Sequence, residues 1–195
     1  MKVLVVYCHP LDDSFAASLR ERALIGLRSA GHQVRLTDLY ADDFDPALSA
    51  WEHVHHLDPP DTKPDIARYV DDLRWCEGLV LVYPTWWSTQ PAMLKGWFDR
   101  VWVQGVAYHL PEGSNRIRPG LAQIRRIVVV TTHGSSKLVN ALQGEGGKRV
   151  ALRSLRVLAN KRTRTRWIAL YAIDRTSHHQ RTKFLERVQR DLSRL

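Results

Sequence analysis

Short apolar runs and segments of helical periodicity alternate along the whole chain. Runs rich in β-branched and apolar residues predict strands at 2–8, 33–39, 78–84, 126–132 and 166–173. The 78–84 run is apolar throughout, which is typical of a central parallel strand buried on both faces. The 33–39 run alternates instead, with Val34, Leu36 and Leu39 pointing inward.

Between these runs, apolar residues recur at the helical period of about 3.6 residues. The first helix begins after Ser14, a favourable N-cap, and is stopped by Gly31 in the C′ position. Further helices are predicted at 65–75, 92–103, 148–158 and 177–195. The connection over 41–64 is so long that we expect it to be functional or partly helical.

Strands that alternate with helices build βαβ units and a parallel sheet. Because crossovers between parallel strands are right-handed, the sequence predicts an α/β, doubly wound, five-stranded, three-layer sandwich that forms a single domain over 1–195. Ligands of such sheets bind outside the carboxyl ends of the strands, at a topological switch point. The candidate functional segments are therefore 9–15, 84–91 and 131–147.

Composition argues against several classes of protein. The chain has no apolar run of the about 18–20 residues that a membrane span needs. Its start is too short for the apolar region of a signal peptide and lacks a small-residue cleavage site, so we expect a cytoplasmic protein without membrane insertion. Cys8 and Cys76 cannot make a disulfide scaffold, and both are expected to be buried thiols.

The 29 basic residues exceed the 20 acidic ones, and the excess lies mainly in 146–173, which has no acidic residue. There Arg149, Arg153 and Arg156 follow at i, i+4 and i+7, as one helical stripe. Two interpretations stand: recognition of the 2′-phosphate of NADPH or of an anionic acceptor, and a solvated face without a ligand. Nucleic-acid binding is disfavoured, because no matching motif and no interleaved aromatic residues accompany the stripe.

The first candidate segment ends in Ser14, at a strand-to-helix turn. Free amides and a hydroxyl at the positive end of a helix suit a phosphate, but taken alone Ser14 is better explained as a structural cap. The segment is neither a Walker loop nor a Gly-x-Gly-x-x-Gly turn, which argues against a nucleotide triphosphatase and a Rossmann-type dinucleotide site. Elsewhere, His53, His55 and His56 lack cysteine or carboxylate neighbours at a ligand spacing, so no metal is predicted.

The other two candidate segments suit a flat heterocycle. Trp86 and Trp87 are adjacent on a loop and cannot readily face one core, so we expect at least one to contact a ligand rather than the core or an interface. The 131–136 stretch is small, polar and rich in amides, which suits the polar edge of a ring. His133 within it is either a hydrogen-bonded loop residue or a catalyst.

These segments resemble the flavodoxin-like NAD(P)H:quinone oxidoreductases, the family that includes DT-diaphorase and the bacterial modulator-of-drug-activity reductases. The similar residues occur in the family's order and extend to about residue 147. They are His9-Pro10, Ser14-Phe15, Tyr83-Pro84-x-Trp86-Trp87-x-x-x-Pro91-Ala92-x-Leu94-Lys95-Gly96-Trp97-x-Asp99-Arg100-Val101, Gly105-x-Ala107-Tyr108, Thr131-Thr132-x-Gly134 and Leu142-Gln143-Gly144.

The resemblance implies a bound flavin, FAD with FMN as the alternative, and NAD(P)H as co-substrate. The residues it assigns to the cofactor are His9, Ser14, Phe15 and Ala16 at the phosphate end, Pro84, Thr85, Trp86 and Trp87 along the isoalloxazine ring, and Thr132, His133 and Gly134 at its polar edge. It further implies a homodimer with the active site at the subunit interface. The implied reaction is hydride transfer through flavin N5 to a quinone-like acceptor.

Two departures from the family pattern matter. The DT-diaphorase branch has a Tyr before and a His after the Leu142-Gln143-Gly144 stretch, thought to relay charge, where this chain has Asn140 and Gly146. The relay is therefore absent or moved, with Tyr108 and His133 as candidate catalytic groups. His133 also stands where the family often has Gly, which would restrict the backbone if φ had to be positive. A regulatory flavoprotein, such as an ancillary subunit of a potassium-efflux transporter, is the alternative function.

Overall fold

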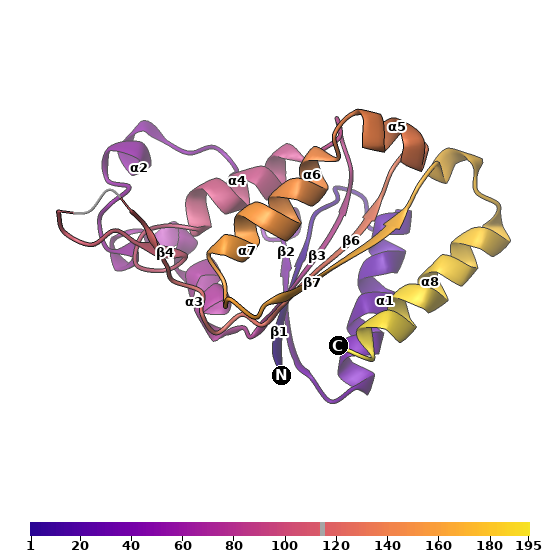
Figure 1. The fold of residues 1–195 in the computed structure, drawn as a ribbon, viewed down its shortest axis with the longest axis horizontal. Helices are drawn as coiled ribbons and strands as arrows, with labels where there is room; N and C mark the ends of the chain where they lie inside the picture. Colours follow the sequence, from indigo (N-terminus) through magenta and orange to yellow (C-terminus); the bar gives the residue numbers. More distant parts are fainter. Residues whose placement is uncertain (114–115) are drawn as a thin grey trace.

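Five parallel strands form the central sheet of the computed structural model, which describes residues 1–113 and 116–195 (Figure 1). The strand order is β2-β1-β3-β6-β7, and each strand runs parallel to its neighbours. The strands are β1 (Lys2–Tyr7), β2 (Gln33–Asp38), β3 (Gly78–Pro84), β6 (Arg126–Thr132) and β7 (Arg164–Leu170). The predicted doubly wound α/β sheet is confirmed, and β3 lies at its centre.

Helices cover both faces of the sheet (Figure 1). One face is covered by α1 (Phe15–Ser29) and α8 (His178–Leu192). The other is covered by α3 (Ala67–Trp75), α4 (Ala92–Val101) and a composite rod of α6 (Gly146–Arg149), a π-helical turn (Val150–Ser154) and α7 (Leu155–Val157). Each layer buries its own apolar cluster against the sheet, which fixes the loops that leave the strand ends.

Irregular segments extend the second layer. The long connection is partly helical, as predicted, with α2 (Ala50–Val54) and the 3-10 turns η1 (Pro60–Thr62) and η2 (Pro64–Ile66). A small antiparallel pair, β4 (Tyr108–His109) with β5 (Arg118–Pro119), lies outside the main sheet. Within the two described ranges, no helix is both long and apolar enough to cross a bilayer.

Two expected details of the core are confirmed. Gly31 follows α1 in the left-handed region, at φ +75°, as a C′ glycine should. Cys8 and Cys76 are buried free thiols, and burial raises the pKa of each to about 12.

Other predicted boundaries are wrong. The strand expected at 166–173 begins and ends earlier, because pairing of Arg164 with Arg126 starts it and a left-handed residue, Ala172 at φ +51°, follows it. The helix expected at 92–103 stops at Val101, since Trp102 leaves helical backbone geometry. The uninterrupted helix expected at 148–158 is the composite rod. An unpredicted helix, α5 (Lys137–Leu142), precedes it.

Candidate functional site

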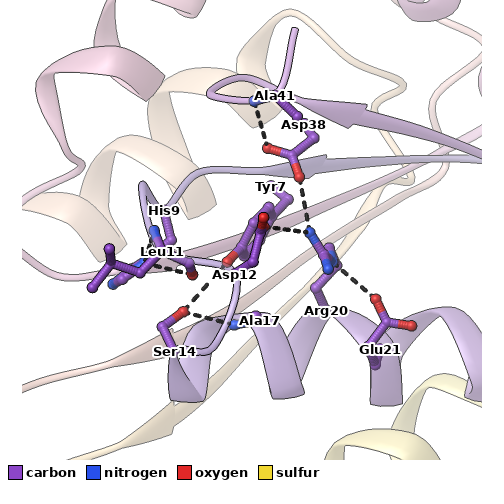
Figure 2. A network of polar contacts seen from close by, with 10 residues as sticks. All are labelled: Tyr7, His9, Leu11, Asp12, Ser14, Ala17, Arg20, Glu21, Asp38 and Ala41. Atoms are coloured by element: carbon purple, nitrogen blue, oxygen red, sulfur yellow. Dashed lines mark hydrogen bonds and ion pairs between the residues drawn. The ribbon is translucent and has the colours of Figure 1, made fainter.

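The loop between β1 and α1 is held in place by its own side chains (Figure 2). Ser14 caps α1: its Oγ accepts a hydrogen bond from the Ala17 amide at 3.1 Å and lies 3.4 Å from the Tyr7 hydroxyl. The capping interpretation of Ser14 is thus confirmed. The amides of Phe15 and Ala16 belong to the first helical turn and have no carbonyl partner within the helix, so they stay available to an anion.

Arg20 lies beneath this loop and is neutralised there. Its guanidinium donates to Asp38 at 2.8 Å and Glu21 at 3.0 Å, and it covers the Tyr7 ring at 4.6 Å (Figure 2). Burial raises the pKa of Tyr7, which keeps the phenol protonated. Because carboxylates already pair with Arg20, an anion at this loop would be held mainly by backbone amides and the helix dipole.

The loop after β3 forms a strained two-residue turn. Trp86 and Thr89 exchange two backbone hydrogen bonds of 3.1 Å, and between them Trp87 and Ser88 adopt φ values of +49° and +63°. This is the geometry of a type I′ turn, which favours Asn and Gly rather than a bulky aromatic residue. Trp87 is 98% exposed and Trp86 39% exposed. Strain combined with an exposed indole is characteristic of functional loops.

Contacts from the α5–α6 region anchor this turn. Ser88 accepts a hydrogen bond from the Gly147 amide at 3.1 Å, and its hydroxyl donates to Gln143 Oε1 at 2.8 Å. The side-chain Nε2 of Gln90 donates to the Gly147 carbonyl at 3.1 Å. The segments that follow β3 and β6 therefore form one structural unit.

A cavity of about 270 Å³ lies between these segments. Its walls are Thr85, Trp87, Ser88, His133, Gly134, Ser135, Asn140 and Gln143. Thr85 is fixed by its amide, which donates to the Thr132 carbonyl at 2.8 Å, and by its hydroxyl, 3.0 Å from that of Thr131. The structure thus brings together sequence-predicted residues from the ends of two neighbouring strands.

The remaining predicted cofactor residues do not line this cavity. Pro84 and Thr132 pair across β3 and β6 just below it. The His9 ring lies 6.3 Å from that of Trp86, which places the β1 loop beside the tryptophan turn. Ser14, Phe15 and Ala16 lie at the start of α1.

His133 is the most unusual side chain of the cavity. It is 6% exposed, and its ring stacks on that of Tyr171 at 4.5 Å between centroids. Neither ring nitrogen has a hydrogen-bond partner among the described residues, although buried polar atoms nearly always have one. Burial lowers the pKa of His133, an effect that Asn140 and Glu145 partly offset. The backbone φ of His133 is not positive, so replacing the family's Gly with His at this position does not strain the backbone.

Tyr108, the other candidate catalytic residue, lies elsewhere in the chain. It is on β4 and lines a separate cavity of about 70 Å³ with Lys63, Arg100 and Trp102 among its walls. Burial raises the pKa of Tyr108. Within one chain, the structure does not bring Tyr108 and His133 into one cavity.

Sequence reasoning missed several residues of the site. Ser135, Asn140 and Gln143 line the cavity and lie in the candidate segment 131–147, but they were not assigned to the site. Tyr171 donates a long hydrogen bond of 3.4 Å to Glu145 and supports His133 from below. It was missed because candidate residues were expected only after the first, third and fourth predicted strands. The fifth strand was also expected to run to residue 173, whereas β7 ends at Leu170 and places Tyr171 at the carboxyl edge.

The predicted basic stripe does not converge on the cavity. The π-helical turn interrupts the α-helical spacing of Arg149, Arg153 and Arg156. Arg156 donates to the Thr163 carbonyl at 3.1 Å, just before β7 and at the opposite edge of the sheet. Across the described ranges, no three His, Cys, Asp or Glu side chains are grouped so as to hold a metal ion.

The strand order and the cavity at the carboxyl edge define a flavodoxin-like α/β protein. A family model described as "Flavodoxin-like fold" matches residues 1–194, and the chain belongs to this family.

Similarity to named proteins agrees with this assignment. The chain is 30% identical over 167 residues to a ribosyldihydronicotinamide dehydrogenase-like protein, traD, of Penicillium crustosum, covering 75% of this chain and 62% of that protein. It is 28% identical over 162 residues to NAD(P)H dehydrogenase [quinone] 1 of Cavia porcellus, covering 75% and 58%. The chain thus spans less than two thirds of the length of these curated relatives.

A solved structure matches over nearly its whole length. The NAD(P)H:quinone oxidoreductase from Methanothermobacter marburgensis is 28% identical, with a TM-score of 0.81 and coverage of 99% of this chain and 98% of that one. The resemblance to quinone oxidoreductases inferred from the sequence is confirmed.

Proposed function

We propose that this chain is a flavin-dependent NAD(P)H oxidoreductase that reduces a quinone or a related electrophile by two-electron transfer. The observation that carries the proposal is the cavity at the carboxyl edge, where a strained turn exposes Trp87 opposite the unpartnered His133. The walls are mainly polar side chains with one exposed indole, which together can hydrogen-bond the polar edge of a flat ring and contact its face. Relatives named as NAD(P)H dehydrogenases support the same class of reaction.

The chain's own residues fit a flavin. The open amides of Phe15 and Ala16 suit its phosphate, and the indoles of Trp86 and Trp87 offer flat surface for its ring. The unpartnered nitrogens of His133 would gain hydrogen bonds from a polar ring edge. We propose FAD, with FMN as the alternative, because His9 and Ser14-Phe15 resemble the FAD-binding branch of the family.

When bound, the flavin would supply the hydride chemistry, accepting from NAD(P)H and donating to the acceptor at N5. The protein would position the reactants and exclude water. Thr85, tied to Thr131 and Thr132, gives a rigid wall, and Trp87 gives an apolar one. A neutral His133 presents one N–H donor and one lone pair to whatever fills the cavity.

The proposed role of Tyr108 needs a second subunit. Because Tyr108 and His133 line different cavities of one chain, Tyr108 would act only across the interface of the proposed homodimer.

The test begins with purified protein and added FAD or FMN. Binding is measured by quenching of flavin fluorescence, and reduction by anaerobic loss of visible flavin absorption with NADH or NADPH, followed by reoxidation with a quinone. Trp86→Ala and Trp87→Ala should weaken flavin binding. Trp51→Ala is the matched control, because Trp51 is 51% exposed but lies on α2, away from the cavity.

Two outcomes would contradict the proposal. If the folded protein binds neither FAD nor FMN, the proposed flavin cofactor is ruled out. A protein that binds flavin but is reduced by neither nicotinamide would favour the regulatory alternative.

A further inference from the structure

A second and larger cavity lies at the other edge of the sheet. It measures about 420 Å³ and is lined by Pro119, Leu152, Arg153, Arg156, Val157, Ala159, Asn160 and Lys161. Figure 1 shows the composite rod running from α5, at the carboxyl edge, toward the start of β7. Because the lining residues Ala159, Asn160 and Lys161 precede β7, this distal cavity opens at the amino edge, away from the flavin site.

The floor of the distal cavity is apolar and rigid. Leu152, Val157, Ala159 and Pro119 provide its apolar surface. Backbone pairing fixes it from below, since the Leu121 amide donates to the Leu158 carbonyl at 3.0 Å and Leu121 forms a β-bridge with Ala159. The cavity is therefore already formed in the protein alone, as small-molecule sites usually are.

The rim of the cavity is cationic and lacks counter-ions. Arg153, Arg156 and Lys161 have no carboxylate partner in the described part of the chain. Other members of the same basic segment do: Lys148 binds Glu145 at 2.7 Å and Arg166 binds Asp191 at 2.8 Å. Arg149, Arg162 and Arg164 of the segment also lack a carboxylate partner in the described part of the chain, but they do not line this cavity. Three unpaired cations of the segment thus lie beside the apolar floor.

Arg156 is already oriented for a ligand. Its Nε donates to the Thr163 carbonyl at 3.1 Å, and Thr163 is itself buried and bonded to the Ile124 carbonyl at 2.7 Å. This bond holds the guanidinium plane and leaves its terminal nitrogens for an anion. Less side-chain entropy is then lost on binding.

The helix that forms one wall is irregular at the same place. Leu152 and Arg153 belong to the π-helical turn Val150–Ser154. Such turns are rare and are frequently found at functional sites. The irregular helix and the unpaired cations are independent observations that coincide at this cavity.

We propose that the distal cavity binds an amphipathic organic anion. An apolar body would lie on Leu152, Val157 and Ala159, and a carboxylate, sulfonate or phosphate head would bind Arg153, Arg156 and Lys161. The volume suits a small molecule rather than a folded partner. This proposal does not depend on the flavin site.

The test uses isothermal titration of the purified protein with octanoate as the anion and 1-octanol as its neutral counterpart. Octanoate should bind, and octanol should bind at least about tenfold more weakly because it lacks the charge-assisted hydrogen bonds. Arg153→Glu with Lys161→Glu should weaken octanoate binding by at least about tenfold. Both side chains are exposed, so the fold should survive, which circular dichroism can verify.

The matched control is Arg149→Glu with Arg162→Glu. It makes the same change of net charge in the same basic segment, but neither residue lines the cavity. We expect its octanoate affinity to stay near that of the unmodified protein. Absence of octanoate binding, equal losses in the two double variants, or equal affinity for octanoate and octanol would each overturn the proposal.

Discussion

The two halves of the long tryptophan motif differ sharply in the folded chain. In the first half, residues 84–90, Trp87 is almost fully exposed and two residues adopt positive φ values. In the second half, α4 buries Trp97 completely and Arg100 almost completely. A single continuous motif therefore combines a segment suited to a ligand with a segment that holds the fold, and resemblance alone does not separate them.

The second half fastens the long connection to the sheet layer. Arg100 binds Glu52 at 2.7 Å and Asp65 at 2.5 Å, and it donates to the Asp45 carbonyl at 2.6 Å. Burial would raise the pKa of Glu52, but hydrogen bonds from Ser49 and Arg100 outweigh it and lower the pKa. A Cβ on Gly96 would lie 2.3 Å from the Pro46 carbonyl oxygen.

Breaking the buried ion pair should have the largest effect. Arg100→Met leaves the buried Glu52 carboxylate unpaired, and we expect a loss of about 3–5 kcal/mol in the free energy of unfolding. The double variant Glu52→Gln with Arg100→Met should recover part of this loss, because that buried charge is gone. Urea unfolding measures both. A loss of less than about 1 kcal/mol in the single variant would show that Arg100 is dispensable for the fold.

Adding one methyl group in the same half should have the next largest effect. Gly96→Ala forces α4 away from Pro46 and should cost about 1–3 kcal/mol, because the obstacle is backbone. Gly134→Ala is the control in the site, where a Cβ would meet only Asp174 at an ordinary 3.4 Å and φ is not positive. Thermal unfolding measures the stability of both variants. Equal losses of stability in Gly96→Ala and Gly134→Ala would contradict the difference between the two halves of the motif.

Relaxing the turn of the first half should change stability in the opposite direction. Trp87→Gly removes a side chain from a positive-φ position and should stabilise the fold by about 1 kcal/mol while weakening flavin binding. Trp87→Ala loses the indole but keeps a Cβ at positive φ, so it should weaken flavin binding without the gain in stability. If Trp87→Gly destabilises the protein, the turn is not strained.

The smallest expected effect is on pH dependence. The pKa of His133 is lowered in the folded state, whereas in the unfolded chain it has the ordinary value of about 6.5. Just below pH 6.5 the unfolded chain therefore binds more protons than the folded one. Stability should therefore fall as pH decreases through that window. His133→Gln should flatten this slope, and the exposed His179→Gln serves as control. An unchanged slope in His133→Gln would show that protonation of His133 does not oppose folding.

The sequence was most informative where strands are buried on both faces. The ends of β3 and β6 were predicted to the residue, because both strands have a continuous apolar stretch, Leu79–Val82 in β3 and Ile127–Val130 in β6, that is buried on both faces. The edge strand β7 carries Arg164 and Arg166, so its start depends on pairing with β6 rather than on hydrophobicity. α5 was missed because Leu138 and Leu142 are exposed, which leaves no inward-facing stripe.

The site was predictable only as a set of strand ends. Thr85, Trp87, His133 and Gly134 were located by the rule that ligands bind at carboxyl edges. The left-handed turn at Trp87 was not predictable, since an indole disfavours that conformation. The separation of Tyr108 from His133 was not predictable, because Tyr108 lies on the two-residue strand β4 outside the main sheet, which is too short to leave a periodic pattern.

The π-helical turn has a consequence for counting residues. A π-turn accommodates one residue more than an α-helix between the same ends, and one residue corresponds to about 100° of rotation around a helix. If a relative has an ordinary α-helix at this place, residues matched to it by counting along the chain no longer occupy equivalent positions after Val150–Ser154. Arg156 and its neighbours would be matched to side chains on a different face, and a ligand that they bind would go unnoticed in any comparison made by alignment.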